Sequence, residues 1–266
     1  MILDYEISHL VPYINWPYFY HAWQLRQPEE QERMRAEAVL FLSNLEGRYK
    51  AHALFLLKEA YSEGDDIVLE GGERIALLRQ QKGTTCLCLS DFIAPKPSSP
   101  NPSSSNRIGI FATSADMGLE TDFDGDPYRK MLAQLLADRL AEAAAECMHE
   151  EVRKHYWGYA PEEQLSMDEL HLERFQGIRP AVGYPSLPDA SLNFVIDRLI
   201  DMKQIGIRLT ESGAMRPHAS VSGLMMAHPQ ARYFDVGKIG PDQLSDYARR
   251  RGLPIEVVKK FLVANL

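Results

Sequence analysis

Residues 52–78 read HALFLLKEAYSEGDDIVLEGGERIALL, and their pattern indicates what kind of sheet the chain forms. Short apolar runs at 53–57, 67–69 and 75–78 have the length that is typical of strands. The break Glu70-Gly71-Gly72-Glu73 between the last two runs predicts a hairpin. We therefore expect an antiparallel sheet rather than a parallel one.

Further strands are expected at 85–89 and 107–112, on either side of a stretch with a different composition. Residues 95–106 are almost wholly Pro, Ser, Asn and Lys, which cannot bury enough apolar surface to offset the entropy of ordering. We interpret this stretch as a flexible, exposed insertion within one sheet. On this interpretation, residues 1–266 form a single domain.

Helix signals surround these strands. One helix should run from Pro28 to about Gly47, and the longest should begin at Asp126 as N-cap with Pro127 behind it and reach about Tyr156. The remaining expected elements are a helix from 188–189 to about 206, strands at 221–227 and 232–236 around a turn at 228–230, and short helices starting at 241 and 254. This mixed order predicts an α+β fold, with a twisted antiparallel sheet and flanking helices.

The bulk composition excludes several classes of function. A net charge of −8 without clusters of Lys and Arg argues against a nucleic-acid partner. The first residues lack the features of a signal peptide, and no apolar run has the roughly 18 residues that span a bilayer, so we expect a cytoplasmic protein without a membrane partner.

Cysteine and histidine spacing predicts neither disulfides nor a metal site. Cys86, Cys88 and Cys147 leave an odd thiol and contain no C-x-x-C pair. His149 and His155 are six residues apart, whereas a zincin helix needs two histidines four apart. We therefore expect His149, Glu150 and His155 to be polar residues on a helix surface.

The loop at 177–185, GIRPAVGYP, carries the residues best suited to bind a ligand. Its prolines fix the backbone, and its glycines allow a ligand to approach closely. Arg179 could hold a carboxylate or phosphate through two parallel hydrogen bonds, and Tyr184 offers a flat face with a polar tip. From the residues alone, a binding rim and a purely structural turn are equally good interpretations.

Segments spread along the whole chain resemble the S-adenosylmethionine-binding activation domain of cobalamin-dependent methionine synthase. Each segment is short, but their order and spacing match those of the family. The segments are INW at 14–16, SDFIAPK at 90–96, ADRLAE at 137–142, YWGYAP at 156–161, the loop 177–185, LTES at 209–212, ASVSG at 219–223 and DYARR at 246–250.

The resemblance implies which residues contact the ligand and which face a partner. Asp138, four residues before Glu142 on one helix face, would reach toward the histidine that leaves cobalt, and Tyr184 would stand over the corrin. The family usually has an aspartate at position 15, so weaker or altered affinity is expected from Asn15. The implied S-adenosylmethionine-binding residues are Asn15, Glu142, Arg179, Ala181, Gly183, Tyr184, Tyr233 and Phe234.

Tyr233 and Phe234 have a simpler interpretation on residue type alone. Aromatic residues are common in strands, so packing within the expected strand at 232–236 would explain both of them without any ligand.

The function implied by the resemblance is the reductive methylation of inert cob(II)alamin on a methionine synthase core, with a flavodoxin-type reductant as electron donor. This chain would contribute the methyl donor and its orientation, acting in trans as a component of the enzyme. A reactivator for another corrinoid methyltransferase and a module that only binds the ligand are the alternatives. Gene neighbourhood and measured ligand affinity, respectively, would distinguish them.

Overall fold

The computed structural model describes residues 1–96 and 107–266. From residue 97 onward, the loop expected at 95–106 lies outside the described residues. The strands of the main sheet are β1 (Ile2–Glu6), β2 (Lys50–Glu63), β3 (Asp66–Leu69), β4 (Arg74–Ala76), β5 (Arg107–Ala115) and β8 (Ser220–Met225), and a small hairpin joins β6 (Arg208–Leu209) to β7 (Met215–Arg216). The helices are α1 (Ile7–Leu10), α2 (Trp16–Ala22), α3 (Pro28–Ser43), α4 (Gly118–Thr121), α5 (Pro127–Glu151), α6 (Met167–His171), α7 (Leu192–Ile200), α8 (Pro241–Arg251) and α9 (Ile255–Phe261).

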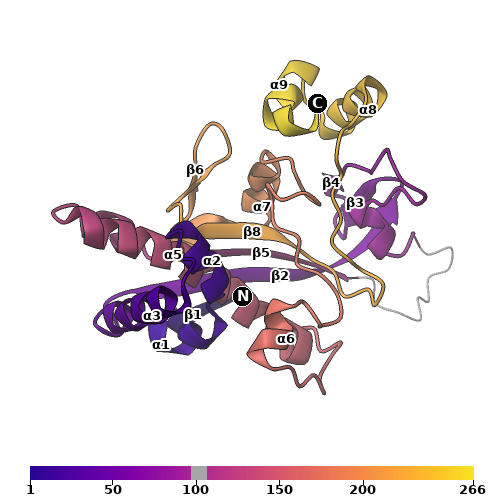
Figure 1. Ribbon diagram of the computed structural model, residues 1–266. Helices are drawn as coiled ribbons and strands as arrows, with labels where there is room; N and C mark the ends of the chain where they lie inside the picture. Colours follow the sequence, from indigo (N-terminus) through magenta and orange to yellow (C-terminus); the bar gives the residue numbers. More distant parts are fainter. Residues whose placement is uncertain (97–106) are drawn as a thin grey trace.

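The main sheet is antiparallel, as the sequence predicts. Its strands follow the order β4-β3-β2-β5-β8, and β1 pairs with the first part of β2. The predicted hairpin is confirmed, since β3 and β4 pair around it with Val68 opposite Arg74. The long strand β2 pairs with β5 and then, through its last residues, with β3 (Figure 1). The expected α+β fold, a curled antiparallel sheet with flanking helices, is therefore confirmed.

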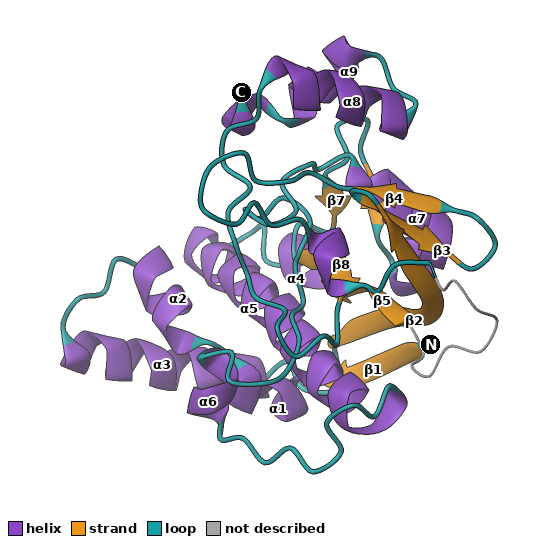
Figure 2. Ribbon diagram, turned by 90° about the vertical axis from the view of Figure 1, so that its right-hand side faces the viewer, coloured by secondary structure: helices purple, strands orange, loops and turns teal. Residues whose placement is uncertain are grey.

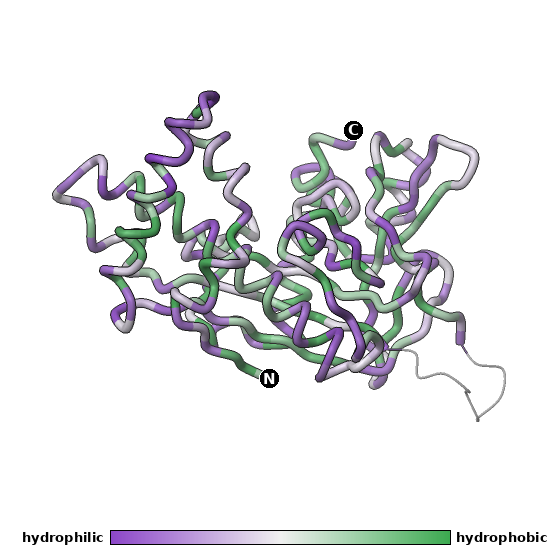
Figure 3. The backbone as a smooth tube through the Cα atoms, turned by 60° about the horizontal axis from the view of Figure 1, so that its bottom comes forward, coloured by the Kyte–Doolittle hydropathy of each residue, from purple (hydrophilic) through white to green (hydrophobic). Residues whose placement is uncertain are grey.

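Both faces of the sheet are covered, because apolar residues on β5 point alternately to its two sides. Phe111 packs in a cluster with α5 and the N-terminal helices, whereas Ile110 and Ala112 pack in a second cluster with α7. A third cluster joins α8 and α9 to β4, and Figure 2 shows these two helices set apart from α1, α2 and α3. Figure 3 shows the hydrophobic strands crossing the middle of the molecule.

The long helix α5 begins as predicted, since the Asp126 side chain accepts hydrogen bonds from the backbone N–H groups of Tyr128 and Arg129. Its last turn widens into a π-helix over Val152–Tyr156. Within this turn Arg153 is fully buried, donates three hydrogen bonds to Glu163 at 2.6 to 3.2 Å and lies over the ring of Phe175. This ion pair connects the end of α5 to the chain that follows the YWGYAP segment.

Four expectations about local structure are wrong. His149 does not lie on a helix surface: it is fully buried against Phe175, and burial lowers the pKa of its imidazole well below the usual range. Residues 85–89 form a bridge at Cys88 and the start of a 3-10 turn instead of a strand. Residues 232–236 have no regular structure, because the backbone there bonds to the loop after residue 184 instead of to a strand. The helix from Pro28 ends at Ser43, before Gly47.

His52 links the first strand to the sheet and should make stability depend on pH. Its ring nitrogens lie 2.7 Å from Asp4 Oδ1 and 3.1 Å from Asp116 Oδ1. The hydrogen bond to Asp116 raises the pKa of His52 although burial opposes its charge, and the bond to His52 lowers the pKa of Asp116. The stabilisation from His52 is complete below its unfolded pKa of about 6.5 and is lost as the pH rises through the folded value. The stabilisation from Asp116 is present above about pH 4 and is lost as the pH falls below this value.

We therefore predict that His52→Gln lowers the free energy of unfolding more at about pH 5.5 than at about pH 8.5. The effects of the substitution at the two pH values should differ by less than about 1 kcal/mol, because the carboxylates of Asp4 and Asp116 are both exposed to solvent. Urea unfolding at the two pH values measures it. A loss of stability that is the same at both values would contradict the prediction.

The structure offers no helix, among the residues that it describes, with the length and apolarity needed to cross a bilayer.

Candidate functional site

The loop 177–185 runs along the free edge of β8 without forming a regular strand. Ile178 and Met226 exchange backbone hydrogen bonds of 2.9 Å, and the backbone N–H groups of Val182 and Leu224 continue this ladder. The close approach depends on Gly223, since a Cβ atom there would lie 2.2 Å from the carbonyl oxygen of Pro180. The absence of a side chain at Gly223, the last residue of the ASVSG segment, therefore allows the loop to lie directly beside the sheet.

A cavity of about 640 Å³ opens between this loop, helix α5, the N-terminal segment and the irregular stretch 233–235. Volumes of this order are typical of sites for small organic ligands. Of the predicted site residues, all of which the structure describes, Gly183 and Asp138 do not line the cavity. The predicted residues that do are Asn15, Glu142, Arg179, Ala181, Tyr184, Tyr233 and Phe234.

Arg179 is held inside the cavity by a carboxylate that the sequence analysis missed. Its Nη2 donates a short hydrogen bond to Glu146 Oε1, and its guanidinium lies 5.7 Å from the centre of the Phe111 ring. Only 8% of the Arg179 side chain and 21% of the Glu146 side chain are exposed. Burial opposes the charge on Arg179, but the neighbouring Glu146 outweighs it and raises the pKa of the guanidinium. Arg179 is therefore a fixed cation at the base of the cavity.

The ion pair is only half satisfied. Among the described residues, neither Arg179 Nε nor Glu146 Oε2 has a hydrogen-bond partner, although both atoms are buried. A buried donor or acceptor without a partner costs about 1 to 3 kcal/mol. Both residues line the cavity, so its wall contains a cation and an anion that are incompletely paired.

Two aromatic residues, Tyr233 and Phe234, form a further part of the cavity wall. The Tyr233 hydroxyl accepts a hydrogen bond of 2.9 Å from the backbone N–H of Arg179, and burial raises the pKa of this hydroxyl to about 12. The backbone N–H of Phe234 donates to Ser186 Oγ at 2.9 Å. Hydrogen bonds rather than strand pairing thereby fix Tyr233 to the loop 177–185 and Phe234 to Ser186, directly after this loop.

Tyr184 lies at the mouth of the cavity and is 56% exposed. Its backbone follows Gly183, whose φ of +90° only glycine adopts easily. The Tyr184 hydroxyl donates a hydrogen bond to Glu142 Oε1 at 3.2 Å, and the charge of Glu142 raises the pKa of this hydroxyl. Asp138 lies on α5 one helical turn before Glu142, and it is not part of the cavity lining. Burial raises the pKa of the Asp138 carboxyl group.

Acidic side chains outnumber basic ones around the cavity. Four carboxylates, those of Glu142, Glu146, Glu173 and Asp235, face two arginines, Arg139 and Arg179. Burial, together with the charge of Glu146, raises the pKa of Glu173. The surplus of negative charge favours a ligand with a net positive charge.

Some lining residues could have been found from sequence patterns and others could not. Glu146 follows Glu142 by four residues and so shares its helix face, which was a usable signal. Tyr13 and Tyr18 flank the INW segment. His171 carries no such signal, because only the tertiary fold brings it to the cavity.

Comparison with known proteins agrees with this architecture. The sequence pattern described as "Vitamin B12 dependent methionine synthase, activation domain" matches residues 6–252. A crystal structure of the MetH reactivation domain bound to AdoHcy superposes with a TM-score of 0.92 at 38% sequence identity, covering 100% of this chain and 90% of that one. The chain therefore belongs to the family of activation domains of vitamin B12-dependent methionine synthase.

Proposed function

We propose that this chain binds S-adenosylmethionine in the 640 Å³ cavity and presents its methyl group to a cobalamin carried by a methionine synthase core. The observation that carries the proposal is the buried pair of Arg179 and Glu146, each with one unpartnered polar atom. An amino acid has one carboxylate and one ammonium group, which complement these two atoms. The AdoHcy-bound relative supports a ligand of this class.

Each predicted residue then has a role that its position supports. Arg179 holds the ligand carboxylate, and Glu146 with Glu142 holds the ammonium group. Tyr233 and Phe234 form the wall for the adenosine. Ala181 and Gly183 shape the loop backbone. Asn15, at the start of α2, and Tyr184, at the rim, provide the remaining contacts.

The charge of the cavity predicts a preference between two related ligands. S-adenosylmethionine carries a sulfonium, so its net charge is one unit more positive than that of S-adenosylhomocysteine. Since carboxylates outnumber arginines around the cavity, the sulfonium compound should bind more tightly. Asn15 contributes a hydrogen bond but no charge to this preference.

The methyl group is transferred on a partner, and this chain positions it. When bound to the partner, cobalamin supplies a cobalt centre that accepts the methyl group after reduction by one electron from a flavodoxin-type protein. The exposed ring of Tyr184 at the cavity mouth offers a flat apolar surface for the corrin. Asp138 stands beside this mouth to bind the displaced cobalt ligand, and the cobalamin-bearing core is proposed to be a separate chain, so that this protein acts in trans.

Calorimetry and a mixing experiment test the proposal. S-adenosylmethionine should bind to one site, more tightly than S-adenosylhomocysteine, and adenosine should bind weakly. Mixing the protein with a methionine synthase core that lacks this domain, a reductant and S-adenosylmethionine should restore the absorbance of the methylated corrin. Failure to bind the ligand would refute the whole proposal, whereas binding without restored absorbance would refute only the action on that partner.

Asp138→Asn should separate partner contact from ligand binding. Because Asp138 lies outside the cavity, the affinity for S-adenosylmethionine should remain within about twofold of the wild type, since no charged contact to the ligand is lost. Methylation of the partner should slow by about tenfold, the value of one charged hydrogen bond. Equal losses of affinity and rate would contradict this division of roles.

A further inference from the structure

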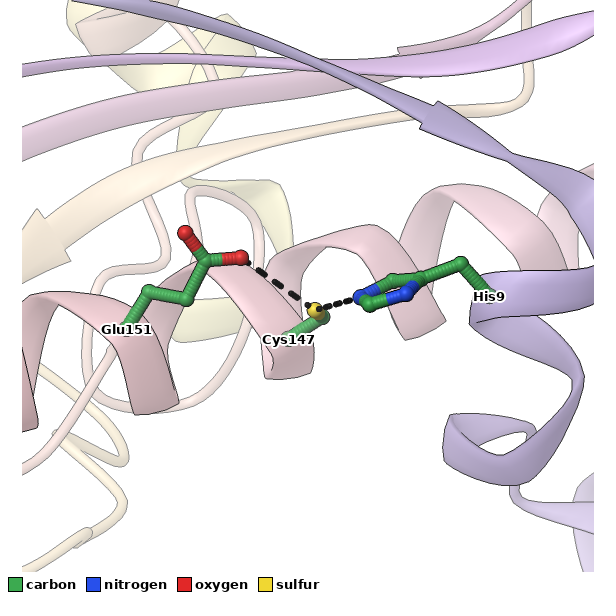
Figure 4. A group of neighbouring side chains, drawn as sticks. All are labelled: His9, Cys147 and Glu151. Atoms are coloured by element: carbon green, nitrogen blue, oxygen red, sulfur yellow. Dashed lines mark hydrogen bonds between the residues drawn. The ribbon is translucent and has the colours of Figure 1, made fainter.

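A second cluster of ligating side chains lies outside the cavity, on the face of helix α5 that carries Cys147 and Glu151. His9 in α1 and Cys147 in α5 are 138 residues apart in the sequence, yet His9 Nε2 lies 3.4 Å from Cys147 Sγ. Glu151 follows Cys147 by one helical turn and places Oε1 at 3.6 Å from the same sulfur atom. Figure 4 shows the three side chains pointing toward one another from the two helices.

The distances fit a tetrahedral metal ion. Zinc bonds of about 2.3 Å to sulfur and about 2.0 Å to nitrogen or oxygen place neighbouring ligand atoms roughly 3.5 Å apart. The two measured separations agree with this value, and all three ligand atoms lie within 4.8 Å of one another. One imidazole, one thiol and one carboxylate form a ligand set that suits zinc better than calcium or magnesium.

The surrounding aromatic residues orient these ligands. The Tyr5 hydroxyl donates to Glu151 Oε1 at 3.0 Å, and the ring of His9 stacks on that of Tyr5 at 5.7 Å with an angle of 7°. Tyr13 stacks on the other side of His9 at 6.3 Å. In metal sites, neighbouring side chains of this kind regularly hold the ligands in the orientation that the ion requires. Cys147 is buried, whereas His9 is exposed, so an ion could enter from the solvent side.

We propose that His9, Cys147 and Glu151 bind one zinc ion, with water in the fourth position, and thereby fasten α1 to the long helix. Spacing along the chain predicted no metal site, because His9 is 138 residues away from Cys147 in the sequence and only the fold brings them together. Binding forms a bond between zinc and the Cys147 sulfur and releases the thiol proton to solvent. A neutral thiol must lose its proton to bind zinc as a thiolate, so release of a proton should accompany binding near neutral pH.

To test the site, the 266-residue chain is stripped of metal with a chelator and titrated with zinc chloride by calorimetry in two buffers of different ionisation enthalpy. We expect a single zinc site and the release of one proton. Cobalt(II) in place of zinc should give a thiolate-to-cobalt charge-transfer band. His9→Gln changes an exposed side chain and should leave the fold intact, and Cys147→Ser removes the thiolate. Each should weaken zinc binding by about tenfold to a hundredfold or more, the range found for disturbed metal sites.

Cys86→Ser is the matched control, because Cys86 is a partly exposed thiol outside the cluster. It should leave zinc affinity and the cobalt spectrum unchanged. The proposal is overturned if the wild type binds no zinc, if His9→Gln binds as tightly as the wild type while its circular dichroism is unchanged, or if the cobalt band depends on Cys86. None of these outcomes depends on whether the protein binds S-adenosylmethionine.

Discussion

Replacing Arg179 with alanine should weaken S-adenosylmethionine binding by about tenfold to a hundredfold, which corresponds to a hydrogen bond to a charged group worth about 1.5 to 3 kcal/mol. The guanidinium is buried in the cavity wall, and among the described residues its Nε has no hydrogen-bond partner. The same change leaves Glu146 as a poorly hydrated carboxylate without its cation. Loss of one partner of a buried pair typically costs about 3 to 5 kcal/mol, so the free energy of unfolding should also fall.

The two effects can be separated by a second variant. In Arg179→Met/Glu146→Gln the buried charges are removed together, which should restore most of the lost stability but not the affinity. Calorimetry measures ligand binding, and urea unfolding measures stability. If folded Arg179→Ala bound the ligand normally, Arg179 would have no place in the site, and if the double variant regained affinity, the loss in the single variant would be structural.

Arg153→Ala should give the largest loss of stability, about 3 to 5 kcal/mol in the free energy of unfolding. Arg153 is fully buried, and Glu163, to which it donates all three hydrogen bonds, is 8% exposed. Alanine therefore leaves an uncompensated carboxylate and a cavity beside Phe175. Denaturant unfolding of the two proteins measures the difference.

An exposed ion pair in the same region provides the control. Arg174 lies 3.6 Å from Glu169, and both side chains are open to solvent. Arg174→Ala should change the free energy of unfolding by less than about 1 kcal/mol. Similar losses from the two alanine variants would show that burial does not determine the strength of the Arg153 pair.

Local signals predicted those parts of the fold that local interactions control. The capping carboxylate of Asp126 and the Gly71-Gly72 hairpin each act within a few residues, and each is where it was expected. The predictions of strands at 85–89 and 232–236 were wrong for a different reason. Residues 85–89 and 232–236 have suitable side chains, but their backbone groups bond to neighbouring loops and to side chains instead of to a strand.

The cavity itself was predictable only in part. The loop 177–185 carried its own signal, and Glu142 with Glu146 shared one helix face. The pairing of Arg179 with Glu146 joins positions 33 residues apart, and the contact of its backbone with Tyr233 spans 54. Such contacts depend on how β8 and α5 pack, which no local pattern specifies. The burial of His149 was missed for the same reason.

The incomplete pairing inside the cavity also limits which metabolites can occupy it. Methylthioadenosine has the nucleoside and the sulfur but no amino-acid tail, and it would cover Arg179 Nε and Glu146 Oε2 without supplying partners for either. Decarboxylated S-adenosylmethionine keeps its ammonium group but has no carboxylate, so it could pair with Glu146 but not with Arg179. Sites built to pair polar groups discriminate strongly against analogues that lack them. Both analogues should therefore bind more weakly than S-adenosylmethionine if the proposed site is correct.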